Sequence, residues 1–203
     1  MANEWFISDT HFSHAFVVGL RQGIAREDVT QKDISEHDER IIRAWNRVVQ
    51  PEDIVWHLGD LAVKPVGRVA HLVARLAGRK RLILGNHDQA HPMFGSKSFD
   101  QFDDTLAAGF EWVGPFAHVG LDLGGQRHTR VALSHFPYRA DREEEADPRE
   151  MQWRLRDEGG LLIHGHLHSA EAMTSDREVH VGWDTWGRPV SRHEVAELFR
   201  AAH

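Results

Sequence analysis

Residues 54–88 read IVWHLGDLAVKPVGRVAHLVARLAGRKRLILGNHD, and this stretch predicts the fold of the chain. Its two apolar runs, at 54–58 and 81–84, have the composition of buried strands. Between them, apolar residues recur at helical spacing over 66–77, and Gly78 suits the end of that helix. A strand, a helix and a second strand predict a parallel βαβ unit. Asp60 and Asn86, which follow the two strands, are therefore expected at one edge of a sheet.

The same alternation of strands and helices continues on both sides of this stretch. Further runs of strand composition lie at 5–8, 131–134, 161–164 and 179–182, with one or two more strands within 110–123. A helix is predicted over 35–49, with Ser35 as its N-cap. Ser191 and Glu194 have the spacing of a capping box, which predicts a last helix to about residue 201.

Composition limits the kind of protein that this chain can be. It has 203 residues, of which 41% are hydrophobic and 27% are charged, as in an ordinary globular protein. We find no linker and expect one domain over residues 1–203. The charged run at 141–147 is interpreted as a solvated loop or a helix start, and Pro148 suits a first helical turn. The net charge of −7 argues against an extended nucleic-acid face or an anionic-membrane face.

Several features of the sequence bear on location and chemistry. The chain has no cysteine, which excludes thiolate metal sites, disulfides and a cysteine nucleophile. Its first residues, MANEWFIS, lack the basic start and long apolar stretch of a signal peptide, and no segment is apolar enough to span a membrane. We expect a cytoplasmic protein without a membrane partner, and the sequence does not indicate an oligomeric state.

Side chains suited to metal binding follow five of the predicted strands. They are Asp9 and His11 in SDTH, Asp60 in LGD, Asn86 in GNHD, His135 in LSHFP, and His166 and His168 in HGHLH. Residues two apart in an extended chain point to one side, so one metal could take Asp9, His11 and one of the last two histidines. A second metal could take the other histidine with Asn86 and His135. Asp60 could then bridge the two ions.

Two metal ions about 3.5–4 Å apart would clamp the attacking and leaving oxygens of a phosphoryl transfer, and a water bridging them would become a hydroxide nucleophile. The clusters SDTH, LGD, GNHD, SH and GHLH, in this order, resemble the motif set of the calcineurin-like metallophosphoesterases. Together with the tail VGWDTWGRPVS, they resemble a branch of small bacterial and phage phosphoesterases without added domains. The resemblance covers residues 9–168.

The resemblance implies an α/β fold, a two-sheet αββα sandwich with the metals at the carboxyl ends of the strands. It implies a first metal site of Asp9, His11, Asp60 and His168, and a second of Asp60, Asn86, His135 and His166. His87 matches a catalytic histidine that contacts the phosphate and protonates the leaving group. Protein phosphatases of the superfamily have a supporting carboxylate where this chain has Val63. A protein phosphatase is therefore not expected, and the group that orients His87 is left open.

Several other polar residues have competing interpretations. His14, Arg21 and Asn86 are candidate substrate contacts, although His14 and Arg21 are also interpretable as surface residues. Asp88 is interpreted as a brace for its loop, and His57 as a packed strand residue. Periodicity does not exclude His164 as a ligand, because it shares one side of a regular strand with the two histidines that follow. Only the resemblance favours His166 and His168.

We therefore expect a dinuclear metal-dependent phosphoesterase that acts on a small phosphorylated substrate, for example a nucleotide. Manganese is the first expected metal in vitro, with iron, zinc, cobalt and nickel as alternatives. Phosphodiesters are favoured over monoesters, because the short segments between the motifs predict an open site. The alternatives are a non-catalytic binding module of the same fold, or another metallohydrolase such as a barrel amidohydrolase, which usually needs about 250 residues.

Overall fold

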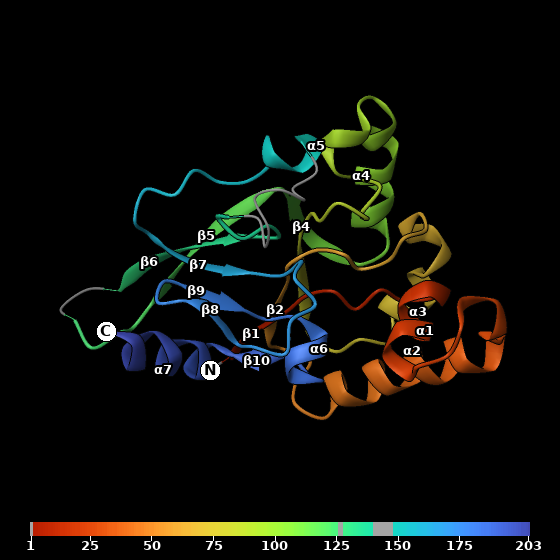
Figure 1. The fold of residues 1–203 in the computed structure, drawn as a ribbon, viewed down its shortest axis with the longest axis horizontal. Helices are drawn as coiled ribbons and strands as arrows, with labels where there is room; N and C mark the ends of the chain where they lie inside the picture. Colours follow the sequence, from red (N-terminus) through yellow and green to blue (C-terminus); the bar gives the residue numbers. More distant parts are fainter. Residues whose placement is uncertain (1, 126–127, 140–147) are drawn as a thin grey trace.

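Two five-stranded sheets face each other across an apolar core (Figure 1). The computed structural model describes residues 2–125, 128–139 and 148–203, so the charged run at 141–147 lies outside the described residues. The strand order is β10-β1-β2-β3-β4 in the first sheet and β5-β6-β7-β9-β8 in the second. The predicted two-sheet α/β fold is confirmed, and the alternative of a barrel is wrong.

The first sheet contains the predicted βαβ unit. Its parallel strands are β1 (Glu4–Ile7), β2 (Ile54–His57), β3 (Arg79–Ile83) and β4 (Phe110–Gly114), and β10 (Val190–Ser191) lies antiparallel beside β1. Neighbouring residues enter different cores: Phe6 and Trp56 pack between the sheets, whereas Ile7 and Val55 pack against helices. Both faces of these strands are buried, which explains why the sequence shows continuous apolar runs rather than alternation.

The second sheet brings another set of strand ends to the same place. Its strands are β5 (Phe116–Leu121), β6 (Thr129–Ser134), β7 (Leu161–His164), β8 (Met173–Ser175) and β9 (Glu178–His180). β6, β7 and β9 run parallel to one another. Ser8, just after β1, forms a parallel bridge with Gly182, just after β9. The carboxyl ends of parallel strands from both sheets therefore meet.

Helices cover the first sheet and close the sandwich. They are α1 (Ala15–Gln22), α2 (Gln31–Asn46), α3 (Ala70–Val73), α4 (Lys97–Ala107), α5 (Pro148–Met151), α6 (Trp183–Trp186) and α7 (Arg192–Ala202). Ile41 and Trp45 of α2 pack into the core on the outer face of the first sheet, near α1 and α3 at one end of the molecule (Figure 1). Val195 and Phe199 of α7 enter the core between the sheets. Within the described residues, no helix has the length and hydropathy needed to cross a membrane.

Two of the helix predictions need correction. Helix α2 begins at Gln31, because Thr30 rather than Ser35 is its N-cap and forms a capping box with Asp33. The helix predicted over 66–77 is a 3-10 turn at Val66–Arg68 followed by the four-residue α3. Glycine and β-branched valines, which are weak helix formers, interrupt that segment. The capping box of Ser191 and the helical turn at Pro148 are confirmed.

Candidate metal centre

The chain leaves its strands through left-handed turns at the predicted ligands. The described residues other than glycine with positive φ are Asp9, His11, Ser13, Asp60, His166 and His168. Five of these six are predicted metal ligands. Aspartate and histidine enter this region more often than most residues, yet each still costs about 1–3 kcal/mol. After His164 these turns end the strand alternation, so residues two apart no longer have to point to the same side.

Glycines next to the ligands allow two loops to approach each other. At Gly59, where φ is 91°, an added Cβ would lie 2.5 Å from Nδ1 of His135. At Gly85, an added Cβ would overlap the carboxylate of Asp60. Any larger residue at either position would push a predicted ligand out of place, so the glycines of LGD and GNHD are part of the site.

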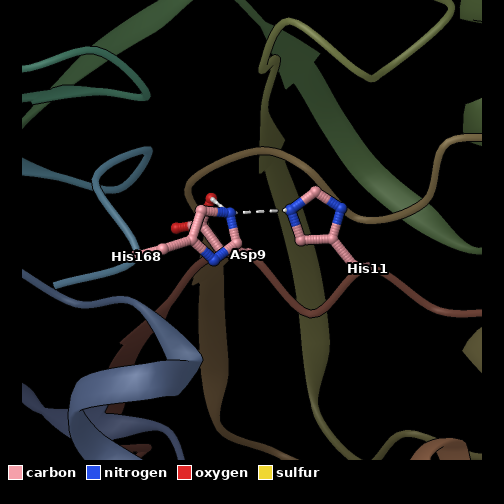
Figure 2. Close-up of side chains that lie close together, drawn as sticks. All are labelled: Asp9, His11 and His168. Atoms are coloured by element: carbon pink, nitrogen blue, oxygen red, sulfur yellow. Dashed lines mark hydrogen bonds and ion pairs between the residues drawn. The ribbon is translucent and has the colours of Figure 1, made fainter. Parts of the chain in front are cut away.

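Asp9, His11 and His168 form the first group of candidate ligands (Figure 2). Nε2 of His11 lies 3.1 Å from Nε2 of His168, and that same atom of His168 lies 3.9 Å from Oδ1 of Asp9. Two imidazole nitrogens bound to one tetrahedral metal ion lie about 3.3 Å apart. The donor atoms thus converge at metal-binding distances, and the residues present fit a divalent ion.

Asn86, His135 and His166 form the second group. Oδ1 of Asn86 lies 3.0 Å from Nε2 of His135 and 3.2 Å from Nδ1 of His166. The two imidazole nitrogens are themselves 3.2 Å apart. One amide oxygen and two ring nitrogens therefore point at one another, as ligands of a common ion would. This group combines the loops after β3, β6 and β7.

Asp60 lies between the two groups. Its Oδ2 is 3.6 Å from Nε2 of His11, and its Oδ1 is 3.5 Å from Nε2 of His135. Each carboxylate oxygen thus faces a ring from a different group, which is the geometry expected of a bridging ligand. Burial and the charge of Asp9 raise the pKa of Asp60 above its usual value. Burial also acts to raise the pKa of Asp9, but the charges of the surrounding histidines hold it below its usual range.

Asp88 holds the loops that carry these ligands. Its Oδ2 accepts hydrogen bonds from the backbone N–H groups of Asp60 at 2.9 Å and Gly85 at 2.8 Å, and its Oδ1 accepts one from Leu61 at 3.0 Å. Burial and the charge of Asp60 raise the pKa of Asp88 above its usual value. The interpretation of Asp88 as a loop brace is confirmed.

Two carboxylates absent from the predicted set contact candidate ligands. Oδ2 of Asp184 lies 2.7 Å from Nδ1 of His168, and Oε2 of Glu150 lies 3.3 Å from Nε2 of His166. Histidines that bind a metal commonly donate their second ring N–H to a carboxylate, which fixes the ring. Burial acts to lower the pKa of His168, but the hydrogen bond to Asp184 raises it above its usual value. A sequence signal existed for Asp184, because it closely follows the strand predicted at 179–182.

Arg21 connects Asp184 to the first loop. Its guanidinium donates to both carboxylate oxygens of Asp184, at 2.7 and 2.8 Å, and to the backbone oxygens of Asp9 at 2.7 Å and Thr10 at 3.2 Å. The remaining N–H lies 2.9 Å from Nε2 of His37. The side chain is 8% exposed, so the interpretation as a surface arginine is wrong. A substrate phosphate could bind Arg21 only by displacing one of these acceptors. We therefore interpret Arg21 as a residue that positions Asp184 and the loop of Asp9 and Thr10.

His87 and His14 lie at the open side of the centre. The His87 side chain is 41% exposed, and its Nε2 is 3.9 Å from Oδ2 of Asp60. The backbone N–H of His87 donates to Oδ1 of the same carboxylate at 2.9 Å. The sequence left open which group orients His87, and Asp60 is a carboxylate that lies beside it. His14 has its ring 5.9 Å from that of His87. Burial and the charge of His87 lower the pKa of His14 to about 4, which makes it neutral at pH 7.

Two further histidines are packed away from the centre. Nε2 of His164 lies 2.8 Å from Oγ1 of Thr174, so this ring serves the second sheet and is not part of either ligand group. His57 is buried, with Nε2 2.9 Å from Oγ1 of Thr10 and its ring stacked 6.5 Å from Trp45. Burial lowers the pKa of both histidines to about 3. The interpretation of His57 as a packed residue is confirmed.

Comparison with known proteins agrees with this geometry. A family model described as calcineurin-like phosphoesterase matches residues 5–170. The Gene 66 protein of Mycobacterium phage L5 is 40% identical over 211 residues, covering 100% of this chain and 97% of that protein. The Gene 66 protein of Mycobacterium phage D29 is 39% identical over 206 residues, covering 98% and 96%. A solved structure of a protein of unknown function from Aquifex aeolicus matches with a TM-score of 0.66 at 24% identity, over 98% of this chain and 100% of that one, which shows the fold alone. The chain belongs to the calcineurin-like phosphoesterase family and is a metal-dependent enzyme that hydrolyses phosphoesters.

Proposed function

We propose that the protein is a dinuclear phosphodiesterase in which His87 assists the leaving group. The position of Asp60 carries the proposal, because its two oxygens lie 3.6 and 3.5 Å from histidines of two separate ligand groups. One metal ion would be held by Asp9, His11, Asp60 and His168, and the other by Asp60, Asn86, His135 and His166. The donor set has oxygen and nitrogen but no sulfur, which suits manganese, and iron, zinc, cobalt or nickel would also fit.

Bound metal ions would supply positive charge for the phosphoryl oxygens and a water of lowered pKa. The residues of the chain would hold the ligand loops in place, protonate the leaving group and contact the substrate. Asp88 and Arg21 hold the loops that carry the ligands, and Asp60 and His11 would lie next to a phosphate bound at the two ions. His87 has an exposed ring beside Asp60, from which a proton on Nε2 could pass to the departing ester oxygen. His14 is neutral at pH 7 and could accept or donate a hydrogen bond to the substrate.

A cavity beside the centre supports a diester rather than a monoester. It has a volume of about 670 Å³, and His11, His87 and His168 line it together with apolar residues of α1. Among these, Phe16 is 46% exposed and Leu20 is 67% exposed. A diester carries a second ester group that needs room, and this apolar wall would offer such a group a surface next to the centre. A small phosphorylated substrate such as a nucleotide would fit the same space.

The proposal is tested by comparing kcat/KM for a methyl nitrophenyl phosphodiester and for nitrophenyl phosphate with the same metal. We expect the diester to be hydrolysed at least as efficiently. Phe16→Ala should raise KM for a phenyl nitrophenyl diester and leave KM for the monoester unchanged, because only the diester reaches the apolar wall. Phe99→Ala is the matched control, since Phe99 is exposed but lines a different cavity. A clear preference for the monoester would refute the diester assignment, and activity in a sample shown by elemental analysis to be metal-free would refute the dinuclear mechanism.

A further inference from the structure

A second cavity, of about 740 Å³, lies between α2 and α6 and contains a row of arginines. It is lined by Arg40 and Arg43 of α2 and by Arg47, the C-cap residue of that helix. Their spacing of three and four residues places them on one face of the helix. Like charges at this spacing repel one another weakly, although Arg43 and Arg47 lie at the C-terminal end of α2, where the helix dipole favours cations.

The structure compensates the row only in part, because the charge of Arg43 acts on the carboxylate of Glu39 one turn earlier in the helix. Among the residues that it describes, none of these three arginines forms a salt bridge with a carboxylate. Other arginines do: Arg75 pairs with Glu39, and Arg177 pairs with Asp157 at 2.7 Å. The carboxylate of Asp184 also lines the cavity, but Arg21 and His168 already bind it. The arginine-lined cavity is therefore a concentrated positive site in a chain whose net charge is −7.

This cavity adjoins the metal centre. Arg21 and Asp184 line both the arginine-lined cavity and the cavity that contains His11, His87 and His168. A ligand with one phosphate at the metals could therefore continue past this pair onto α2. The charges of Arg21 and Asp184 neutralise each other, so the pair presents no net repulsion to an anion that passes over it.

The length of the row indicates the kind of anion. Arg40 and Arg47 are separated by seven residues, which is about 10.5 Å along a helix. One strand of B-form nucleic acid advances about 3.4 Å along the duplex axis per phosphate, and a row of this length can therefore reach more than one phosphate of the same strand. Arginine is also suited to phosphate, because its planar fork can donate two hydrogen bonds to one group.

We propose that this face of α2 binds the phosphate backbone of a nucleic-acid strand whose scissile phosphodiester lies at the metal centre. The inference rests on the proposed phosphodiesterase function and names its substrate class. The sequence predicts no extended nucleic-acid face, because net charge does not reveal a local row. Binding here requires only this short face, and the acidic remainder of the surface would restrict the strand to it.

The test measures binding of a fluorescently labelled single-stranded oligonucleotide to the metal-free protein by anisotropy, over a range of salt concentrations. Arg43→Gln and Arg47→Gln should each weaken binding about fivefold at 0.1 M salt and reduce the slope of log K against log salt by about 0.7, the loss of one phosphate contact on a single strand. Arg68→Gln is the matched control, because it removes the same charge from an exposed residue outside the cavity. It should change neither quantity.

The outcomes separate this inference from the proposed function. Because metal-free protein is used, a failure of hydrolysis leaves the binding result intact and counts only against the phosphodiesterase. Absence of oligonucleotide binding, or equal losses in Arg43→Gln and Arg68→Gln, would overturn the inference even if the aryl diester is hydrolysed. With metal-loaded protein, Arg43→Gln should raise KM for the oligonucleotide about fivefold and leave the kinetics of the aryl diester unchanged. An equal change for both substrates would also overturn it.

Discussion

Replacing Asp184 by Asn should weaken metal binding although Asp184 is not itself a candidate metal ligand. Oδ2 of Asp184 lies 2.7 Å from Nδ1 of His168 and also accepts from Arg21 at 2.8 Å, while Oδ1 accepts from Arg21 at 2.7 Å. An asparagine has one oxygen and one NH₂ group. Whichever way it is turned, an N–H donor would face either the imidazole N–H or the guanidinium. The His168 ring would lose its fixed orientation, and the charge that favours its binding tautomer would be gone.

The magnitude follows from these contacts. Loss of a group that orients a metal-binding histidine typically costs about 10–100-fold in metal affinity. This corresponds to about 1.4–2.8 kcal/mol, since each tenfold change is about 1.4 kcal/mol. Arg21 keeps its bonds to the backbone oxygens of Asp9 and Thr10, so the loop should remain folded. The loss should therefore appear in the affinity of the first metal site and not in the fold.

The assay is activity and calorimetric binding as a function of manganese concentration. In Asp184→Asn, the activity curve should shift to about 10–100-fold higher metal, and turnover at saturating metal should approach that of the unaltered protein. Asp157→Asn is the matched control: it removes the same charge from a carboxylate paired with Arg177 away from the centre. An unshifted metal curve, or a loss of turnover that saturating metal does not restore, would refute the positioning role.

Three further predictions concern other parts of the chain. Asp60→Asn should lose both metal ions by elemental analysis, whereas His168→Ala should lose one; equal metal content in Asp60→Asn and the unaltered protein would show that Asp60 does not bridge. His87→Ala should retain its metals while turnover falls about 10²–10⁴-fold, and less for a nitrophenolate leaving group, which needs no proton; loss of metal would make His87 a ligand. Arg188 and the Ser191 cap lower the pKa of Glu194 from 4.5 to about 2, so its ionised form stabilises the fold above pH 4.5 and that contribution is lost as the pH falls toward 2. Glu194→Gln should therefore lower the metal-free melting temperature at pH 7, and the difference should shrink below pH 4.5; a difference independent of pH would contradict the charge-based explanation.

Much of the fold could be predicted from local patterns. Residues 161–164 were predicted as a strand and are β7, and the capping box of Ser191 opens α7 as expected. These elements depend on neighbouring residues alone. The prediction failed at Ser35, because Thr30 offers a better-placed cap, and over 66–77, where helical spacing reflects burial of apolar side chains rather than a continuous helix. Apolar spacing reports which residues face a core, and a broken helix can satisfy it.

The sequence by itself determined the chemistry of the centre: the types of side chain, their order, and their places after strands. Among His164, which ends β7, and His166 and His168, which follow it, the tertiary structure shows which rings converge, because left-handed turns at His166 and His168 break the periodicity that would have grouped them with His164. The tertiary structure also showed that Arg21 is a positioning residue. Its partner Asp184 lies 163 positions further along the chain. Hydrogen bonds between residues so far apart depend on how the two sheets meet at their strand ends. That meeting arises from packing of the whole core, which no local pattern encodes.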